Sequence, residues 1–535
     1  MGRRAPPEAG RPGPVTKGVL LPSLEFARLV DPRVVLVLAS VAYRWPALIN
    51  ASTLDSDAAV VGLQAMHILR GEWSWLLFGS GYQTSVDSVV AAPFFLVLGP
   101  TPLALMLSTL AGHILATVLA YATLARHLPR WTAALGTLPL VFTPSPLHTY
   151  ILGPPRQASL TLVFAAVWLL DGSRSIRDES GTRSALTLAF AGAMIASLAC
   201  FADPYALLFL PALILLGLLT LRDATFEHVR PIARWGVLVL GTLLGIVPLL
   251  ALLSSARSVH GEATFTTAVF GHNLRLLTDQ CLPWILSTTV YVPAAEAVYV
   301  PWRSGVFRIV QLTGSSLLLL GMIFGSWDSS VGSPASRDLG RFGSVVLVVT
   351  LGAFLVSPMV MDLFSARYLA AIILMCPFAL APAAARLGCM RFGILLAPYL
   401  VSAAAAGWLG FGDRVRGFVP VQLPDAGARD EDQLERLLSD RGIHHGVADY
   451  WVAYRLTFIY REAIQVVPFN VQEDRYAPYR LALDRASTVA YVFDALRSRE
   501  RPDQLTLELA STGRYGPPKE ILHVGSLVAL LADRR

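Results

Sequence analysis

The sequence has few charged residues. Only 15% of its 535 residues are Asp, Glu, Lys or Arg, whereas 54% are hydrophobic, and the mean hydropathy is +0.55. A soluble domain is usually about 25% charged and about 45–50% apolar. The apolar residues also form runs of roughly 17–25 residues, the length that crosses a bilayer core. The composition therefore excludes an ordinary soluble globular protein and predicts an integral membrane protein with many spans.

Cysteine is also scarce, and no sequence repeat is visible. The four cysteines are Cys200, Cys281, Cys376 and Cys389. They are scattered, without CxxC or paired spacing, so they indicate neither a disulfide framework nor a zinc site. The C-terminal tail contains no nucleophile, metal or phosphate-loop motif.

The positive net charge has a topological explanation. The net charge is +6, but the arginines lie mainly between apolar runs. Basic residues concentrate in cytoplasmic connections of membrane proteins. We therefore expect membrane lipids, and not nucleic acid, as the surroundings of this chain.

Run length and breaker residues predict about eleven transmembrane helices. No small-residue cleavage site follows the first apolar run, so we interpret it as a retained span and not as a signal peptide. The expected spans are 33–49, 101–126, 131–144, 157–171, 184–201, 204–221, 235–253, 306–326, 342–357, 368–385 and 392–411.

The arginines between these spans give the orientation. With a cytoplasmic N-terminus, every cytoplasmic connection is basic, as the positive-inside rule requires. The chain then divides into a disordered basic arm (1–30), a transmembrane unit (31–415) and a soluble extracytoplasmic domain (420–535). The outer loops of the transmembrane unit are 50–100 and 254–305. The arginines that support this topology are Arg126, Arg130, Arg174, Arg177, Arg183, Arg222, Arg230, Arg234, Arg337, Arg341, Arg386 and Arg391.

The first outer loop is too polar in its first half to be one span. We expect a surface helix at 58–69, a turn at 70–72, an aromatic patch and a second helix at 86–98 that leans into the membrane. The patch contains Trp73, Trp75 and Phe78. Aromatic residues favour the headgroup level, so this patch and the aromatic loop 254–305 are expected near the outer leaflet.

The tail beyond residue 420 has the mixed charges of a soluble domain. Helical periodicity at 431–441 and 450–460 alternates with short β-like runs, which predicts a small α/β domain. The β-like runs are 464–467, 488–493, 505–509 and 527–531.

Three carboxylates mark the first outer loop. Asp55 and Asp57 stand two residues apart just after the first span, and Asp87 precedes the next apolar stretch. Ionisable residues at such positions of a membrane protein are usually functional. An isolated Asp titrates near pH 4, so Asp57 is suited to remove a proton from an attacking hydroxyl as a general base.

Other roles for these carboxylates stay open. Asp55, Ser56 or Asp57 could cap the helix that follows, and Asp87 could cap a helix, orient the acceptor or help bind a metal. Three carboxylates suit a hard divalent cation such as Mg²⁺ or Mn²⁺, but no histidine joins them at a fixed short spacing.

More polar residues lie at the expected outer ends of other spans. Arg156 and Arg367 could grip a phosphate through two parallel hydrogen bonds, or could extend toward the lipid headgroups. Asp203 precedes a proline and could be a turn residue. The other members of this group are His148, Tyr150, Asp362 and Tyr368.

The same residues carry a resemblance. The first loop resembles that of GT-C membrane glycosyltransferases, and is similar to the protein O-mannosyltransferases and the lipid A aminoarabinose transferases. Shorter stretches at 201–204, 366–369 and 446–458 are similar to patterns in bacterial members. The loop segments that carry the resemblance are 54–63, 67–72, Gly81-Tyr82, and 87–99 with its Ala-Ala-Pro turn.

The resemblance implies a fold, a reaction and site residues. Such enzymes transfer a sugar from a polyprenyl-phosphate carrier to an acceptor hydroxyl at the outer leaflet, with inversion. Asp57 matches the loop Asp that acts as base, Asp87 matches the acid before the Ala-Ala-Pro turn, and Tyr82 joins the expected substrate-binding residues. Many relatives have Glu directly after the loop Asp, whereas this chain has Ala58. Asp55 or Asp87 would have to replace that Glu.

The expected function is therefore a polyprenyl-phosphate-sugar glycosyltransferase of a bacterial inner (plasma) membrane. Its acceptor would be a lipid, glycan or protein. The leaving phosphate needs no general acid, so positioning and charge stabilisation would carry catalysis with the base. The alternatives are a transporter or flippase, which would favour charges at the midplane and repeated halves, and a non-catalytic membrane assembly subunit.

Overall fold

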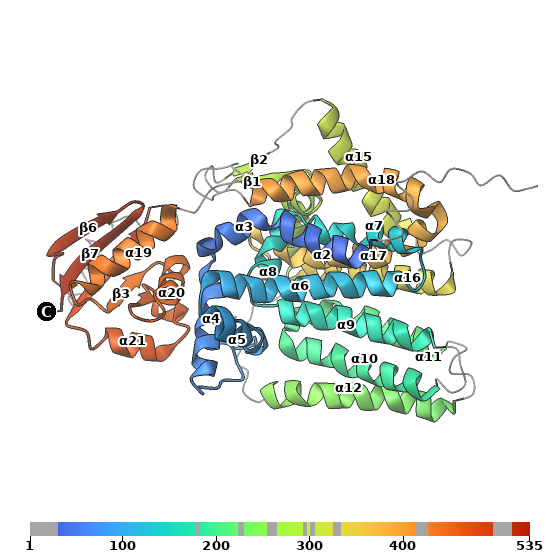
Figure 1. The fold of residues 1–535 in the computed structure, drawn as a ribbon, viewed down its shortest axis with the longest axis horizontal. Helices are drawn as coiled ribbons and strands as arrows, with labels where there is room; N and C mark the ends of the chain where they lie inside the picture. Colours follow the sequence, from blue (N-terminus) through green and yellow to red (C-terminus); the bar gives the residue numbers. More distant parts are fainter. Residues whose placement is uncertain are drawn as a thin grey trace, which may run out of the picture.

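The computed structural model describes residues 30–176, 182–222, 229–253, 265–292, 297–299, 305–324, 333–411, 426–495 and 516–534. Within these ranges the protein is a bundle of long helices with a smaller α/β unit beside one end (Figure 1). Residues 1–29 of the expected basic arm and the β-like run 505–509 lie outside the described residues.

Each span expected from the sequence coincides with one helix or with consecutive shorter ones. Gly388, with φ +68°, breaks α18 so that its second part matches the last expected span. The helices are α2 (Pro32–Tyr43), α3 (Trp45–Ile49), α6 (Pro102–Leu124), α7 (Arg130–Val141), α9 (Gln157–Arg174), α10 (Thr182–Ala202), η4 (Pro204–Leu208), α11 (Leu210–Leu221), α12 (Pro231–Leu253), α15 (Val306–Phe324), α16 (Pro334–Val356), η8 (Leu363–Leu369), α17 (Ala370–Ala379) and α18 (Ala381–Gly410).

Several of these helices begin with a capping residue followed by proline. The side chain of Thr101 accepts the N–H of Ala104 at the start of α6, and Pro102 occupies the first helical position, where its missing N–H costs nothing. Among the described residues, six helices are long and apolar enough to cross a membrane: α6, α10, α12, α15, α16 and α18. The protein is therefore a polytopic helical membrane protein, as its composition predicts.

Short elements connect the long helices. They are η1 (Ala51–Thr53), η2 (Ser145–Leu147), α8 (His148–Ile151), α13 (Thr267–Leu276), the π-helical turn η6 (Leu277–Cys281), α14 (Leu282–Ile285), and the antiparallel pair β1 (Val290–Val292) and β2 (Ala297–Tyr299).

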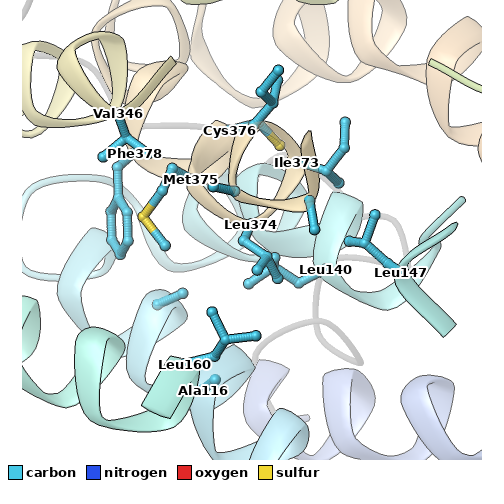
Figure 2. Packing of buried hydrophobic residues seen from close by; sticks show 14 of the residues in the cluster. Ala116, Leu140, Leu147, Leu160, Val346, Ile373, Leu374, Met375, Cys376 and Phe378 are labelled. Atoms are coloured by element: carbon cyan, nitrogen blue, oxygen red, sulfur yellow. The ribbon is translucent and has the colours of Figure 1, made fainter. Parts of the chain in front are cut away.

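The bundle packs around α17, whose ten residues are all buried. Figure 2 shows its side chains against Leu140 of α7, Leu160 of α9 and Val346 of α16. On the other side of α9, helices α10 and α12 follow as successive neighbours (Figure 1). The outer face of α12 exposes Ile232, Trp235 and further apolar side chains, as expected for a helix in contact with lipid.

The first outer loop contains two helices, α4 (Ser56–Leu69) and α5 (Val86–Leu98), close to the expected ranges. The expectation that α4 lies on the surface is wrong, since eleven of its residues, including Ala58 and His67, are buried. α4 does not have the polar face of a surface helix, because α5 covers one side of it and the C-terminal domain covers another.

The C-terminal domain is a five-stranded mixed sheet in the order β4-β3-β5-β7-β6. β3 pairs in parallel with β4 and β5, whereas β7 is antiparallel to β5 and β6. The strands are β3 (His445–Ala448), β4 (Gln465–Pro468), β5 (Thr488–Asp494), β6 (Glu520–Val524) and β7 (Leu527–Asp533). The helices are α19 (Ala426–Ser439), α20 (Tyr450–Ile459), η9 (Val471–Glu473) and α21 (Ala477–Leu483).

The first loop and the C-terminal domain share one hydrophobic core, in which Val61 and Phe95 pack with Tyr454 and Phe458. At Gly62 a Cβ would lie 2.7 Å from the Phe458 ring, so only glycine allows α4 and α20 to approach this closely. The C-terminal domain therefore packs tightly on the loop that holds Asp57.

Candidate active site

Asp57 lies in the first turn of α4, and its side chain is 36% exposed. The hydroxyl of Tyr450, the first residue of α20, donates to Asp57 Oδ1 over 2.5 Å. Arg475 Nη2 lies 3.6 Å from the same oxygen. Two residues of the C-terminal domain thus contact the carboxylate that sequence analysis marks as the base.

Tyr450 and Arg475 hold each other in place. Arg475 Nε donates to the Tyr450 hydroxyl over 3.1 Å, and Nη1 donates to the carbonyl of Gly79 over 3.2 Å. The Arg475 backbone N–H donates to the hydroxyl of Tyr454 over 2.5 Å. Burial, with the nearby charge of Asp57, raises the pKa of Tyr450 well above its usual value, so Tyr450 stays protonated and donates.

A small, open cleft lies over this group. Its wall combines residues of the first loop, of the segment before α9 and of the C-terminal domain. They are Asp57, Val60, Leu77, Phe78, Gln83, Pro155, Tyr450 and Arg475.

Asp55 is the N-cap of α4, and its Oδ1 accepts the N–H of Ala58 over 2.9 Å. This is one of the alternatives that the sequence left open. The cap orients the first turn of α4 and so the direction in which Asp57 points.

Asp87 caps a different helix from its own. It is 6% exposed, and its two oxygens accept the backbone N–H groups of Arg156, over 2.8 Å, and Ala158, over 3.0 Å, at the start of α9. Burial raises the pKa of Asp87 to about 6, against the opposite effect of these hydrogen bonds. The contact ties α5 to the N-terminus of α9, where negative charge is favoured.

Arg156 lies among aromatic rings. Its φ of 106° is unusual for a residue with a side chain, and such backbone conformations cost about 1–3 kcal/mol. Its guanidinium carbon lies 5.2 Å from the ring centre of Tyr150, 5.3 Å from that of Tyr205 and 5.9 Å from that of Tyr368. Nη1 also donates to the Tyr150 hydroxyl over 2.5 Å. Arg156 is thus fixed at the end of the bundle near the cleft.

Asp203 links Arg156 to the cleft. Its Oδ2 lies 3.5 Å from Arg156 Nε and accepts a hydrogen bond of 3.2 Å from Gln83, which lines the cleft. Its Oδ1 accepts the N–H of Tyr205 over 2.8 Å, which is the expected turn role. Burial raises the pKa of the neighbouring Tyr82, with the charge of Arg156 acting in the opposite direction.

Arg367 and Tyr368 approach from η8. The Arg367 guanidinium carbon lies 5.4 Å from the Tyr368 ring centre. Its buried Nε has no hydrogen-bond partner within the described part of the chain. The Tyr368 carbonyl accepts from the Tyr205 hydroxyl over 3.1 Å. Arg367 therefore offers a donor near the rings that surround Arg156.

His148 packs in the apolar core. Its ring stacks on Phe411 with centres 3.9 Å apart and planes 7° from parallel. Its substrate-binding role stays a prediction.

Sequence analysis missed three residues of the site. Tyr450 lies in a stretch that carries the family resemblance, which is the one signal that could have drawn attention to it. Gln83 and Arg475 lie in polar segments of the sequence, where no motif or periodicity marks them as functional. Arg475 reaches Asp57 through the packing of the C-terminal domain on the first loop, whereas Gln83 is held in the cleft wall by Asp203.

The three loop carboxylates do not fit a shared metal site. Asp55 binds the N–H of Ala58, Asp57 binds Tyr450, and Asp87 binds the start of α9. Within the described ranges no group of three His, Cys, Asp or Glu side chains could hold a metal ion.

No protein-family model matches the chain, and no curated protein matches it in sequence. Among solved structures, ArnT from Cupriavidus metallidurans bound to undecaprenyl phosphate is similar at 12% identity over 93% of this chain and 97% of that chain, with a TM-score of 0.42. The Archaeoglobus fulgidus oligosaccharyltransferase in complex with Zn and sulfate is similar at 11% identity over 91% of this chain and 71% of that chain, with a TM-score of 0.45.

The archaeal oligosaccharyltransferase AglB from Archaeoglobus fulgidus, in complex with an inhibitory peptide and a dolichol-phosphate, is similar at 12% identity over 92% of this chain and 71% of that chain, with a TM-score of 0.45. Similarity at this level assigns no residue roles, so the roles proposed below rest on the side chains of this chain.

Proposed function

We propose that this protein is a membrane glycosyltransferase that moves a sugar from a polyprenyl-phosphate carrier to an acceptor hydroxyl, with Asp57 as the general base. The observation that carries the proposal is the half-exposed carboxylate of Asp57 in a cleft, with Tyr450 and Arg475 on one of its oxygens. Both of these partners, within the described part of the chain, lie on Oδ1, and Oδ2 is proposed to accept the proton of the incoming hydroxyl. The first-loop resemblance to GT-C enzymes supports the same reaction.

The proposed reaction is a single displacement. Asp57 takes the proton of the acceptor hydroxyl as that oxygen attacks the anomeric carbon. The bond from the anomeric carbon to the phosphate oxygen breaks, and the electron pair leaves with the polyprenyl phosphate. Attack opposite the leaving group inverts the anomeric centre. General-base catalysis of this kind contributes about 10²–10⁴-fold to a rate.

The leaving phosphate needs positive charge near the membrane surface. Arg367, whose Nε has no partner among the described residues, and Arg156, fixed by its tyrosines, are proposed to bind it. Asp203 and Tyr82 are proposed to position Arg156 and the donor. Asp87 contributes by fixing the backbone of Arg156.

The proposed orientation places this end of the bundle outside the cytoplasm. The N-terminus would be cytoplasmic, and residues 420–535 would form a periplasmic or extracellular domain of a bacterial inner membrane protein. Arg126 and Arg174, at the opposite ends of α6 and α9 from the cleft, support this orientation. The donor would reach the site from the outer leaflet, and the acceptor would be a lipid, glycan or protein.

The test is sugar transfer in membranes that contain the full-length protein. Membranes are incubated with radiolabelled polyprenyl-phosphate sugars, and the labelled product is isolated. Asp57→Asn keeps the shape of the side chain and removes the base, so we expect transfer to fall by about 10²–10⁴-fold at unchanged protein level. The matched control is Asp440→Asn, at an exposed aspartate of the C-terminal domain. Normal transfer by Asp57→Asn would remove Asp57 from the reaction.

A further inference from the structure

His67 lies in the last turn of α4, at the opposite end of the helix from Asp57. Its side chain is 5% exposed and stands between two glutamates. Nδ1 is 2.6 Å from Glu72 Oε2, in the turn after α4, and Nε2 is 2.8 Å from Glu462 Oε1, in the C-terminal domain. The imidazole therefore joins the first loop to the C-terminal domain.

The two short contacts define the protonation state. A neutral imidazole has one N–H and can donate to one carboxylate, whereas an imidazolium donates to both. Burial lowers the pKa of His67, but hydrogen bonds to Glu462 and Glu72 and the charges of both glutamates outweigh burial and raise it. The last turn of a helix also favours a cation. The geometry thus fits an imidazolium.

Within the described residues, the other polar groups around His67 support its charged partners. Arg70 Nη1 lies 2.5 Å from Glu462 Oε2, and the Tyr479 hydroxyl donates to Glu462 Oε1. The Tyr476 hydroxyl donates to Glu72 over 3.4 Å. Burial raises the pKa of Glu462, but the hydrogen bonds from His67 and Tyr479 lower it to about 2 overall. Glu462 is therefore a carboxylate at all but strongly acidic pH.

The partners of His67 are continuous with the groups that reach Asp57. Glu462 follows α20, whose first residue is Tyr450, and Tyr476 directly follows Arg475. On the loop side, His67 and Asp57 share α4, ten residues or about 15 Å apart. The His67 contacts and the Asp57 contacts thus close the two ends of one interface.

We propose that His67 is a positioning residue: its two-glutamate bridge holds the C-terminal domain on the first loop in the register that places Tyr450 and Arg475 on Asp57. The catalytic consequence rests on the proposed function of Asp57, whereas the docking itself does not. The bridge is assembled when His67 is protonated. Deprotonation turns a nitrogen lone pair toward one glutamate and weakens the docking.

The sign of the pH effect follows from the raised pKa of His67. A group whose pKa is higher in the docked state stabilises that state fully at pH values below its free value, near 6.5, and loses this contribution as the pH rises through the raised value. Docking is therefore expected to weaken on the alkaline side. A second loss is expected only in strong acid, as Glu462 becomes protonated.

The experiment measures docking without relying on transfer. Hydrogen exchange of α21 and of residues 460–463 is followed by mass spectrometry in the full-length protein in detergent, corrected for intrinsic exchange rates. Between about pH 6 and about pH 9, we expect protection in the wild type to fall by about tenfold, the size of one lost charge-assisted hydrogen bond. His67→Gln is expected to show the low protection at both pH values.

Two further variants separate a proton-dependent bridge from simple packing. Glu72→Gln removes one bridge at a half-exposed side chain, 55% accessible, and is expected to shift the midpoint of the wild-type pH profile down by roughly one unit. His127→Gln is the matched control, because it removes a histidine–carboxylate contact with Asp171 at the opposite end of α6. It should leave the profile unchanged.

Protection that is independent of pH in the wild type, or equal at about pH 6 in the wild type and His67→Gln, would overturn the proposal. A midpoint that stays in place in Glu72→Gln would do the same. Failure of the proposed function has a different signature, which is transfer retained by Asp57→Asn together with the expected exchange profiles. With both proposals correct, transfer by the wild type falls on the alkaline side in parallel with docking, whereas transfer by His67→Gln is low at both pH values and lacks this fall.

Discussion

Asp57 and Asp171 are both aspartates with an arginine beside them, at opposite ends of the bundle. Asp171, near the end of α9, is fully buried, and both its oxygens are occupied by Arg126 Nη1 over 3.1 Å and His127 Nε2 over 2.8 and 3.0 Å. Asp57 is 36% exposed and has its partners on one oxygen. Both aspartates have an arginine neighbour, so solvent access is what distinguishes Asp57, the proposed base, from Asp171.

The two carboxylates also differ in where their partners come from. Asp171 is held by residues 44 and 45 positions away, within the same bundle. Tyr450 is 393 positions from Asp57 and belongs to another domain. The buried cluster can form as the bundle forms. The Asp57 cluster requires the C-terminal domain to be folded and docked, so it is the part of the molecule that docking can control.

The largest effect should come from Asp171. Asp171→Ala leaves Arg126 and His127 without their buried partner, and breaking such a pair costs about 3–5 kcal/mol. We expect a large loss of thermal stability in detergent. Asp57→Ala removes a half-exposed carboxylate and should cost about 1 kcal/mol or less. Equal stability losses in the two variants would mean that Asp57 and Asp171 contribute equally to stability, contrary to this prediction.

The next effect should come from Arg475. Arg475→Met removes the positive charge beside Asp57 and the link to the Gly79 carbonyl, and we expect transfer to fall by about 100-fold with little change in thermal midpoint. Arg436→Met, at an exposed arginine of the same domain, is the control. If both variants transfer equally well, the C-terminal domain contributes no charge to the reaction.

The smallest effect should come from Tyr450. Tyr450→Phe keeps the ring packing and removes the one O–H that donates to Asp57. A hydrogen bond to a charged group is worth about 1.5–3 kcal/mol, and we expect the lower end of this range, a fall in transfer of about tenfold, because Arg475 still lies beside Asp57. The assay is the same membrane assay. A rate above that of the wild type would mean that Tyr450 competes with the acceptor hydroxyl for Asp57.

Much of the fold follows from local sequence. The apolar runs place the spans within a few residues, and the helices at 86–98 and 450–460 form where their periodicity predicts them. The strands β3 and β6 and the helix α21 were missed because each is short and lacks a strong period. The buried position of α4 was missed because nothing local shows that a second domain covers it.

Only part of the site could be predicted, because many of its contacts join residues that are distant in the sequence. The resemblance of the first loop indicated Asp57, but the cap formed by Asp87 on α9 joins residues 69 and 71 positions apart. Gln83, Arg475 and the bridge at His67 have no local signal, because hydrogen-bond partners that are distant in sequence leave no periodic pattern.

The sequence by itself determined that this chain is a helical membrane protein, where its spans lie and which loop carries carboxylates, because hydrophobic run length and capping residues act over neighbouring positions. Only the tertiary structure decided which carboxylate is enclosed and which stays open, since that depends on how the C-terminal domain packs on the first loop. Side-chain packing of distant segments sets solvent access and hydrogen-bond partners, and these decide what an aspartate can do.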